Sequence, residues 1–161
     1  MVLLERALAA GHDAPARLQH GDLWPPNVLV DRGHWYVLDL ELFGRIRVPL
    51  YDLLHMLHIC SDVRRPGGRT GRPWIERIST GDASEAAPLA LIRRIATRQG
   101  LSPVAMFATV VYYVVDIAAR VKARGAWTAD WREYVAQVER LADLIADGTA
   151  TPESLFRVAR V

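Results

Sequence analysis

The sequence is poor in cysteine and contains no long hydrophobic run. Its single cysteine, Cys60, cannot form a disulfide within the chain, which fits a reducing compartment. The longest apolar run, residues 104–115, ends at Asp116 and is shorter than the ~20 residues that a membrane-spanning helix needs. The first residues carry a charge inside their apolar stretch, so the pattern does not predict a signal peptide. We expect a cytoplasmic protein without a membrane partner.

Charge of one sign is also lacking, since 20 basic and 18 acidic residues give a net charge of +2. So small an excess does not indicate a nucleic-acid partner. Lysine is nearly absent: Lys122 is the only one, and all other basic residues are arginine. With 161 residues, of which 51% are hydrophobic and 24% charged, the chain has the size and composition of a single globular domain, residues 1–161.

Hydrophobic periodicity and turn residues predict an α+β fold that is mostly helical. Ser102 and Pro103 suit a helix N-cap and first turn, and Gly33 suits a hairpin turn. The predicted elements are a helix at 3–10, an extended segment at 17–19, a β-hairpin at 28–30 and 35–38 with its turn at 31–34, a helix at 51–60 with Pro49 in its first turn, an Arg- and Gly-rich loop at 61–73, and C-terminal helices within 88–147, at 88–99, 103–123 and from Thr128 onward.

Residues 20–27, His-Gly-Asp-Leu-Trp-Pro-Pro-Asn, have the H-x-D-L-x-x-x-N spacing of a kinase catalytic loop. Phosphoryl transfer needs a carboxylate that orients the acceptor hydroxyl and accepts its proton, which fits Asp22. It also needs hard oxygen ligands for Mg²⁺, which fits Asn27 and Asp39. Because a hairpin brings its two ends together, Asn27 and Asp39 can face one metal ion.

The same residues carry a family resemblance. HGDLWPPNVLV followed by VLDLE, and then Tyr51-Asp52-Leu53, is similar to the signature of aminoglycoside phosphotransferases, choline kinases and their relatives. The resemblance is strong over residues 17–57, which would hold the catalytic loop, the hairpin and a bracing helix. It implies a protein-kinase-like C-terminal lobe that uses ATP and Mg²⁺ to phosphorylate a small hydroxylated molecule. The roles it implies are Asp22 as catalytic aspartate, Asn27 and Asp39 as Mg²⁺ ligands, and His20 and Asp52 as supports.

Two positions depart from related patterns. Gly21 stands where regulated protein kinases carry an arginine, so control through an activation-loop phosphate is not expected. Pro26 stands where the family often has glycine, and proline fixes φ and removes an N–H, so the loop can differ locally. Glu41 either supports the metal site or plays no part in it.

A kinase fold normally also needs a glycine-rich strand-turn-strand and a strand lysine that pairs with the phosphates. Only 19 residues precede His20, and Lys122 lies among the predicted C-terminal helices. We therefore expect the N-terminal ATP lobe to be absent. The chain is then a truncated kinase that is inactive alone, one half of a two-chain kinase, or a non-catalytic interaction module. A metal-dependent hydrolase using the same residues is a weaker alternative, because the motif supplies few of the histidine and carboxylate ligands that such sites use.

Other candidate groups are more simply explained by packing or solvation. His55, His58 and Cys60 have metal-like spacing, but they lie in an apolar segment and are interpreted as packing residues. Residues 81–161 carry nine acidic and ten basic residues, so no acidic lining for a polycationic aminoglycoside is indicated. A basic loop is interpreted as solvated and contains Arg64, Arg65, Arg69 and Arg72. An aromatic set is interpreted as part of the core and contains Tyr112, Tyr113, Trp127 and Trp131.

Overall fold

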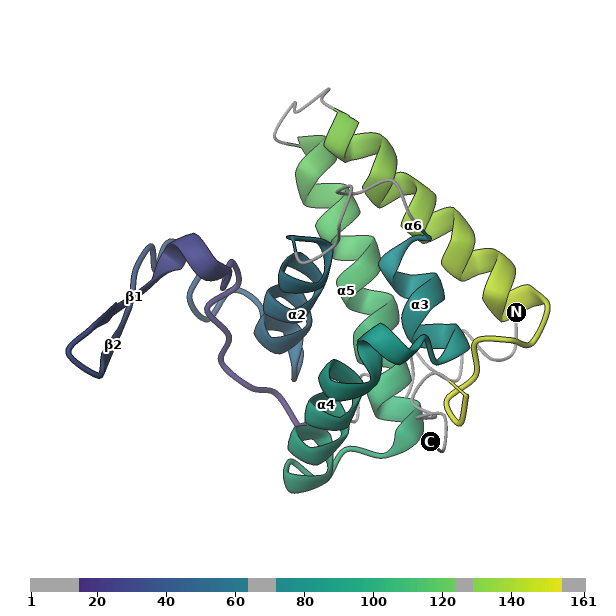
Figure 1. The fold of residues 1–161 in the computed structure, drawn as a ribbon, viewed down its shortest axis with the longest axis horizontal. Coiled ribbons are helices and arrows are strands. Elements are labelled where there is room, and N and C mark those ends of the chain that lie inside the picture. The colour runs from purple at the N-terminus through teal and green to yellow at the C-terminus, as the bar shows by residue number, and fades with distance from the viewer. Residues whose placement is uncertain (1–14, 64–71, 124–128, 155–161) are drawn as a thin grey trace.

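The structure is a computed structural model that describes residues 15–63, 72–123 and 129–154. It is mostly helical with one two-stranded antiparallel sheet, as predicted. Figure 1 shows a helical body from which the small hairpin projects to one side. The elements in chain order are η1 (Pro25–Asn27), β1 (Val28–Asp31), β2 (His34–Val37), α2 (Tyr51–Val63), α3 (Trp74–Thr80), η2 (Ala83–Glu85), α4 (Ala86–Arg98), α5 (Pro103–Ala123) and α6 (Ala129–Ala146).

Helix α5 forms the centre of the helical body, with α2 on one side and α3 and α6 on the other (Figure 1). It begins as predicted, because the Ser102 hydroxyl accepts a hydrogen bond from the Ala105 N–H at 3.1 Å. By length and composition this helix could cross a membrane, but 61% of its most apolar window is buried inside the protein. The apolar run is therefore the core helix of the body.

The hairpin has the predicted position and turn. Val28 pairs with Val37 and Asp31 with His34, so only Arg32 and Gly33 form the loop. Both have positive φ, 47° and 82°, which is the pattern of a two-residue turn that matches the twist of the strands. Every residue of β2 is exposed, including Trp35, which is 73% exposed. The ladder and the turn therefore hold the hairpin, without a core of its own.

The helix bounds correct several predictions. Helix α2 begins at Tyr51, so Pro49 precedes it instead of lying in its first turn, and it continues to Val63, beyond the predicted end at 60. Leu50, with φ of 64°, turns the chain just before the helix. Helix α4 starts at Ala86, two residues earlier than predicted. The predicted helix at 3–10, the cap Thr128 and most of the basic loop lie outside the described residues.

Helix α3 was not predicted, and its amphipathic pattern is hidden by a buried charge. Arg77, 1% exposed, donates to Glu85 Oε1 at 2.8 Å, to the Arg72 carbonyl at 2.8 Å and to Ser61 Oγ at 2.8 Å. An arginine in the middle of a short segment suggests a solvent-facing position in a sequence. Here it joins α3 to η2 through a buried ion pair with Glu85, and α3 to α2 through its hydrogen bond to Ser61.

Candidate active site

The motif at residues 20–27 begins where the chain passes the first turn of α2, and Asp52 fixes it there. One Asp52 carboxylate oxygen accepts the His20 backbone N–H at 2.6 Å, and the other accepts that of Gly21 at 2.8 Å. In return, the Gln19 side-chain oxygen accepts the Asp52 N–H at 3.1 Å and so satisfies a free donor at the helix start. The predicted support Asp52 therefore contacts the motif directly, through two charge-assisted bonds.

The His20 ring joins Asp22, within the motif, to the segment that follows the hairpin. Its Nδ1 accepts the Asp22 backbone N–H at 3.3 Å, so the neutral ring carries its proton on Nε2. That Nε2–H donates to the Leu38 carbonyl at 2.7 Å. Because Leu38 directly precedes Asp39, the imidazole holds the two carboxylate-bearing segments at a fixed separation.

Gly21 is required by both backbone conformation and space. Its φ is +89°, a region that residues with a Cβ rarely adopt. A Cβ at this position would lie 2.9 Å from Leu42 Cβ and 3.1 Å from the Leu42 carbonyl oxygen. The departure from arginine noted in the sequence therefore has a steric cause in this fold.

The other side of the motif is held by α5. Arg120 donates to the Gly21 carbonyl at 2.8 Å and pairs with Asp116 at 2.7 Å, and its guanidinium lies 5.2 Å from the centre of the Tyr51 ring. The Tyr51 hydroxyl donates to the same Asp116 carboxylate at 2.6 Å. Burial, and then this bond, raise the pKa of Tyr51, which keeps the phenol a protonated donor.

Asp22 is partly open to solvent, with 21% of its side chain exposed. Its carboxylate Oδ1 lies 3.5 Å from Nε2 of His55, which is buried on α2. Its backbone carbonyl accepts the Asn27 side-chain N–H at 3.0 Å. Asp22 thus reaches the surface, and its two neighbours come from α2 (His55) and η1 (Asn27).

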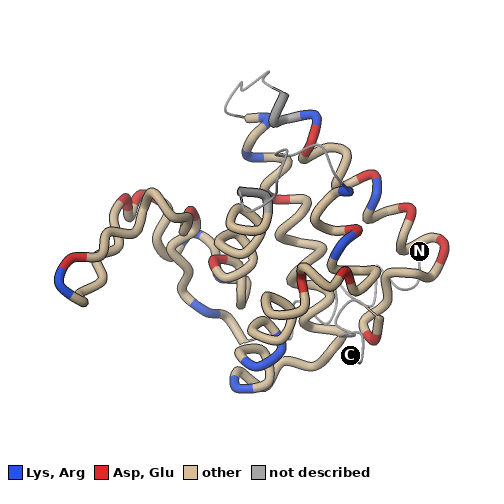
Figure 2. Tube along the Cα trace, in the orientation of Figure 1, with Lys and Arg blue, Asp and Glu red and all other residues tan. Residues whose placement is uncertain are grey.

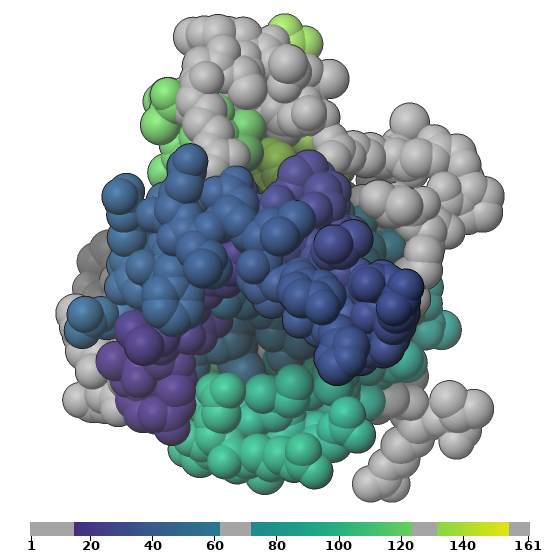
Figure 3. All heavy atoms as spheres, turned by 90° about the vertical axis from the view of Figure 1, so that its left-hand side faces the viewer, coloured from purple at the N-terminus to yellow at the C-terminus, as the bar shows by residue number. Residues whose placement is uncertain are grey.

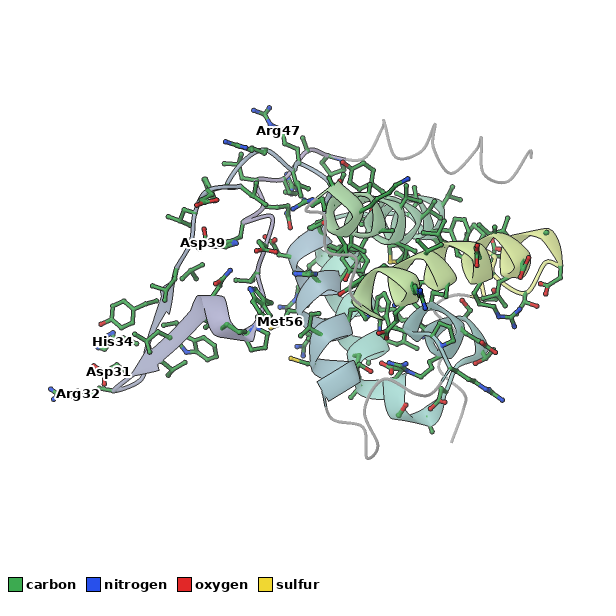
Figure 4. All side chains as sticks on the ribbon, turned by 90° about the horizontal axis from the view of Figure 1, so that it is seen from above. Asp31, Arg32, His34, Asp39, Arg47 and Met56 are labelled. Carbon is green, nitrogen blue, oxygen red and sulfur yellow. The ribbon has the colours of Figure 1, made fainter. Side chains whose placement is uncertain are left out.

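At the base of the hairpin, the backbone places Asn27 opposite Leu38, the residue before Asp39. The Leu38 N–H donates to the Asn27 carbonyl at 2.9 Å, which extends the strand pairing to the residue before Asp39. Asp39 adopts φ of +59° and is exposed, and Figure 4 shows it between the hairpin tip and the helices. Because Asn27 uses its amide nitrogen for Asp22, its side-chain oxygen faces no hydrogen-bond donor among the described residues.

The donor set fits a hard cation. One amide oxygen and one exposed carboxylate, both reachable from solvent, are ligands that Mg²⁺ accepts while it keeps several of its waters. Glu41 is exposed in the following turn, and no described contact ties it to Asn27 or Asp39. In the space-filling view of this face, a hollow opens between the loop-and-hairpin segment and α4 (Figure 3).

The remaining candidates are separated from this group. His58 is buried against Tyr113 and Gln137, and Cys60 contacts Met56, so the metal-like spacing does not converge on one point. No three side chains of His, Cys, Asp or Glu group closely enough to hold a metal in the parts of the chain that are described.

The predictions for the aromatic set and for the arginines of the basic loop have different outcomes. Tyr113 is fully buried as predicted, whereas Tyr112, expected in the core, is 41% exposed. Trp127 and the Trp131 side chain lie outside the described part. Arg72 lies 4.0 Å from Glu76, and the other three arginines of the predicted basic loop fall in the undescribed segment 64–71.

Sequence reasoning missed His55 and Arg120 as neighbours of the motif. His55 was assigned to packing, and it is buried, but its ring also faces Asp22. A signal existed for both. His55 follows Asp52 by three positions and therefore shares its helix face, and Asp116 and Arg120 have the i, i+4 spacing of a helical ion pair.

The comparisons with known proteins agree with the motif. A family model described as the phosphotransferase enzyme family matches residues 2–83, slightly more than half of the chain. No curated protein and no solved structure matches the chain.

Proposed function

Because the chain belongs to the phosphotransferase enzyme family, we propose that it transfers the γ-phosphoryl group of ATP to a hydroxyl of a small molecule. The observation that carries this proposal is the fixed geometry around Asp22. Asp52, Arg120 and His20 bind the backbone of residues 20–22 from three sides. A loop held in this way can present one carboxylate in a constant orientation, which general-base catalysis requires.

Asp22 is proposed as the catalytic residue. Its carboxylate orients the acceptor hydroxyl and accepts its proton as the oxygen attacks the γ-phosphorus, while the bond from that phosphorus to the ADP oxygen breaks. The partial exposure of Asp22 supports this role, because the acceptor must reach it.

Asn27 and Asp39 are proposed to hold Mg²⁺. The ion, when bound, would neutralise charge on the β- and γ-phosphates. The protein's own contribution is to keep two oxygen ligands together, through the Leu38–Asn27 backbone bond and the Asn27–Asp22 bond. The strained φ of Asp39 is consistent with a backbone held for a function, since such strain persists only where surrounding contacts impose it.

We further propose that the chain is the C-terminal lobe of a kinase-like fold and that a lobe bearing a glycine-rich hairpin and a lysine completes the ATP site. The exposed apolar side chains of the hairpin support this assignment, because exposed apolar surface often marks an interface. Leu29 and Tyr36 lie on one face of the two strands, Val30, Trp35 and Val37 lie on the other, and Leu38 is exposed just after β2. The alternative, a non-catalytic interaction module, would use the same side chains and would not need Mg²⁺ or ATP.

The acceptor is proposed to be a small hydroxylated molecule without a high positive charge. Residues 81–161 carry nine acidic and ten basic residues, so this part of the chain has no excess of acidic groups for a polycation. Figure 2 shows positions of both signs along α6. We propose a cytoplasmic reaction, since ATP is its phosphate donor and the chain has a single cysteine.

Calorimetric titration of the chain with ATP, with and without Mg²⁺, tests the metal and nucleotide roles. We expect Mg²⁺-dependent binding that is lost in Asp39→Ala and retained in Asp31→Ala. Asp31 is a matched control because it lies at the hairpin tip, away from Asp39 (Figure 4). Binding that is unaffected by Asp39→Ala would contradict the metal assignment. Absence of binding at millimolar ATP would favour the interaction module or a strict need for the second lobe, and adding that lobe distinguishes these two.

A further inference from the structure

Behind Asp22, a row of buried polar side chains crosses the helical body. His55 Nδ1 lies 3.3 Å from the Tyr113 hydroxyl, which lies 2.7 Å from His58 Nδ1. His58 Nε2 lies 2.8 Å from the Gln137 side-chain nitrogen. Each of these four residues is at most 5% exposed, and they come from α2, α5 and α6. Burying four polar groups in a core is costly unless each has a partner, so their arrangement is constrained.

The direction of each hydrogen bond among these four side chains can be assigned by starting from Gln137. Gln137 Oε1 accepts the Ile75 backbone N–H at 3.3 Å, so the Gln137 NH₂ faces His58 and donates to its Nε2. A neutral His58 then carries its proton on Nδ1 and donates it to the Tyr113 oxygen. The Tyr113 hydroxyl proton is left to donate to His55 Nδ1.

These hydrogen-bond directions determine which nitrogen of His55 carries the proton that faces Asp22. Since His55 Nδ1 accepts from Tyr113, the neutral ring carries its proton on Nε2, the atom that lies 3.5 Å from Asp22 Oδ1. We propose that His55 is a positioning residue for Asp22, and that Tyr113, His58 and Gln137 fix the ring tautomer which presents an N–H to the carboxylate. The proposal rests on the proposed function, because it gives Asp22 its catalytic meaning.

The aromatic rings around His58 hold its ring in one orientation and so keep the direction of these hydrogen bonds from reversing. Its ring stacks on Trp74 with centroids 4.8 Å apart and planes 16° apart, and it meets Tyr113 and Tyr134 edge-on. A ring flip would move both nitrogens away from their partners within this aromatic enclosure. The separation of 3.5 Å between His55 and Asp22 is long for a hydrogen bond, and catalytic contacts of this kind commonly shorten when substrate binds.

Nitrogen NMR of the chain labelled with ¹⁵N-histidine tests the tautomers without ATP. We expect His55 protonated on Nε2 and His58 on Nδ1. Tyr113→Phe removes the donor to His55 and should abolish its tautomer preference, while His58 stays fixed by Gln137 and reports that the fold is intact. Tyr112→Phe is the matched control, because it removes a hydroxyl from the neighbouring, exposed position of α5. His55 protonated on Nδ1, or unchanged by Tyr113→Phe, would overturn the proposal.

Kinetics in the phosphotransferase with both lobes test the positioning role. Tyr113→Phe should lower kcat on the order of tenfold, as loss of an outer orienting partner commonly does, and leave KM for ATP unchanged. His55→Gln keeps an N–H for Asp22 and should retain more activity than His55→Phe. Equal activity of these two variants would also overturn the proposal. Correct tautomers in a protein that transfers no phosphate would contradict the proposed function, whereas wrong tautomers in an active enzyme would contradict this inference alone.

Discussion

The motif at residues 20–27 and the hairpin are neighbours in sequence, but they are held in opposite ways. Residues 20–22 receive side-chain bonds from α2 and α5, and His20 and Gly21 are buried. The hairpin is held by its own ladder and its two-residue turn, and its apolar side chains face outward. The comparison indicates that, of these two segments, the long-range side-chain bonds hold the one that must keep a single geometry. The adjacent apolar surface is left available for another surface to cover.

The largest effect should come from the carboxylate of the loop itself. We expect Asp22→Ala to lower the phosphotransfer rate, measured with the proposed ATP lobe present, by about 10²- to 10⁴-fold, the usual contribution of a general base. Asp31→Ala on the hairpin should leave the rate unchanged. Steady-state kinetics of both variants measure this difference, and a wild-type rate in Asp22→Ala would rule out the catalytic assignment.

The support beneath the loop should matter for stability. Asp52→Ala leaves the His20 and Gly21 N–H groups without their charged acceptor, so we expect the free energy of unfolding to fall by about 3 kcal/mol. Urea denaturation of the chain measures it. Removing the exposed carboxylate of Asp31 should cost less than about 0.5 kcal/mol. Equal losses in the two variants would remove the contrast between loop and hairpin.

Two glycines with similar backbone angles sharpen the comparison. Gly21→Ala should cost about 2 kcal/mol, because its Cβ meets Leu42 at 2.9 Å in addition to the strain of φ +89°. Gly33→Ala in the hairpin turn has φ of +82° but no atom within 4 Å, so we expect only the backbone term of about 1 kcal/mol. Urea denaturation of both variants tests this. A Gly33 variant as unstable as the Gly21 variant would show that crowding by Leu42 contributes nothing.

The smallest effect is expected on the outer face of the hairpin. Trp35 is 73% exposed, so Trp35→Thr should change the free energy of unfolding by less than about 0.5 kcal/mol. The same substitution should reduce binding of a hydrophobic dye, because it removes the largest exposed ring of the hairpin. A loss of stability above 1 kcal/mol would mean that Trp35 is covered in solution, for example by a second copy of the chain.

Much of the local structure could be predicted from sequence because its causes are local. The turn at Arg32 and Gly33, and the start of α5 at Ser102 and Pro103, depend on residues within a few positions of one another. The resemblance carried by residues 17–57 is confirmed by the family match. The roles of Asp22, Asn27 and Asp39 remain predictions.

What could not be predicted depends on partners far along the chain. Helix α3 was missed because Arg77 forms an ion pair with Glu85 and a hydrogen bond to Ser61, which the sequence around Arg77 does not reveal. His55 was assigned to packing because its partner Asp22 lies 33 positions away. The start of α2 at Tyr51 was predicted, but Pro49 was wrongly placed in its first turn because Leu50 adopts a positive φ, which its residue type does not favour.

The bond from Arg120 to the Gly21 carbonyl also has a consequence for the order of folding. It joins residues 99 positions apart, so all of the chain between Gly21 and Arg120 must be synthesised before it can form. Closing so long a loop costs entropy before any contact compensates for it. The hairpin can form early from its own residues, whereas residues 20–22 gain their bond from Arg120 only when α5 docks against α2. A ribosome-bound chain that has not yet exposed α5 should therefore carry the motif without its working geometry.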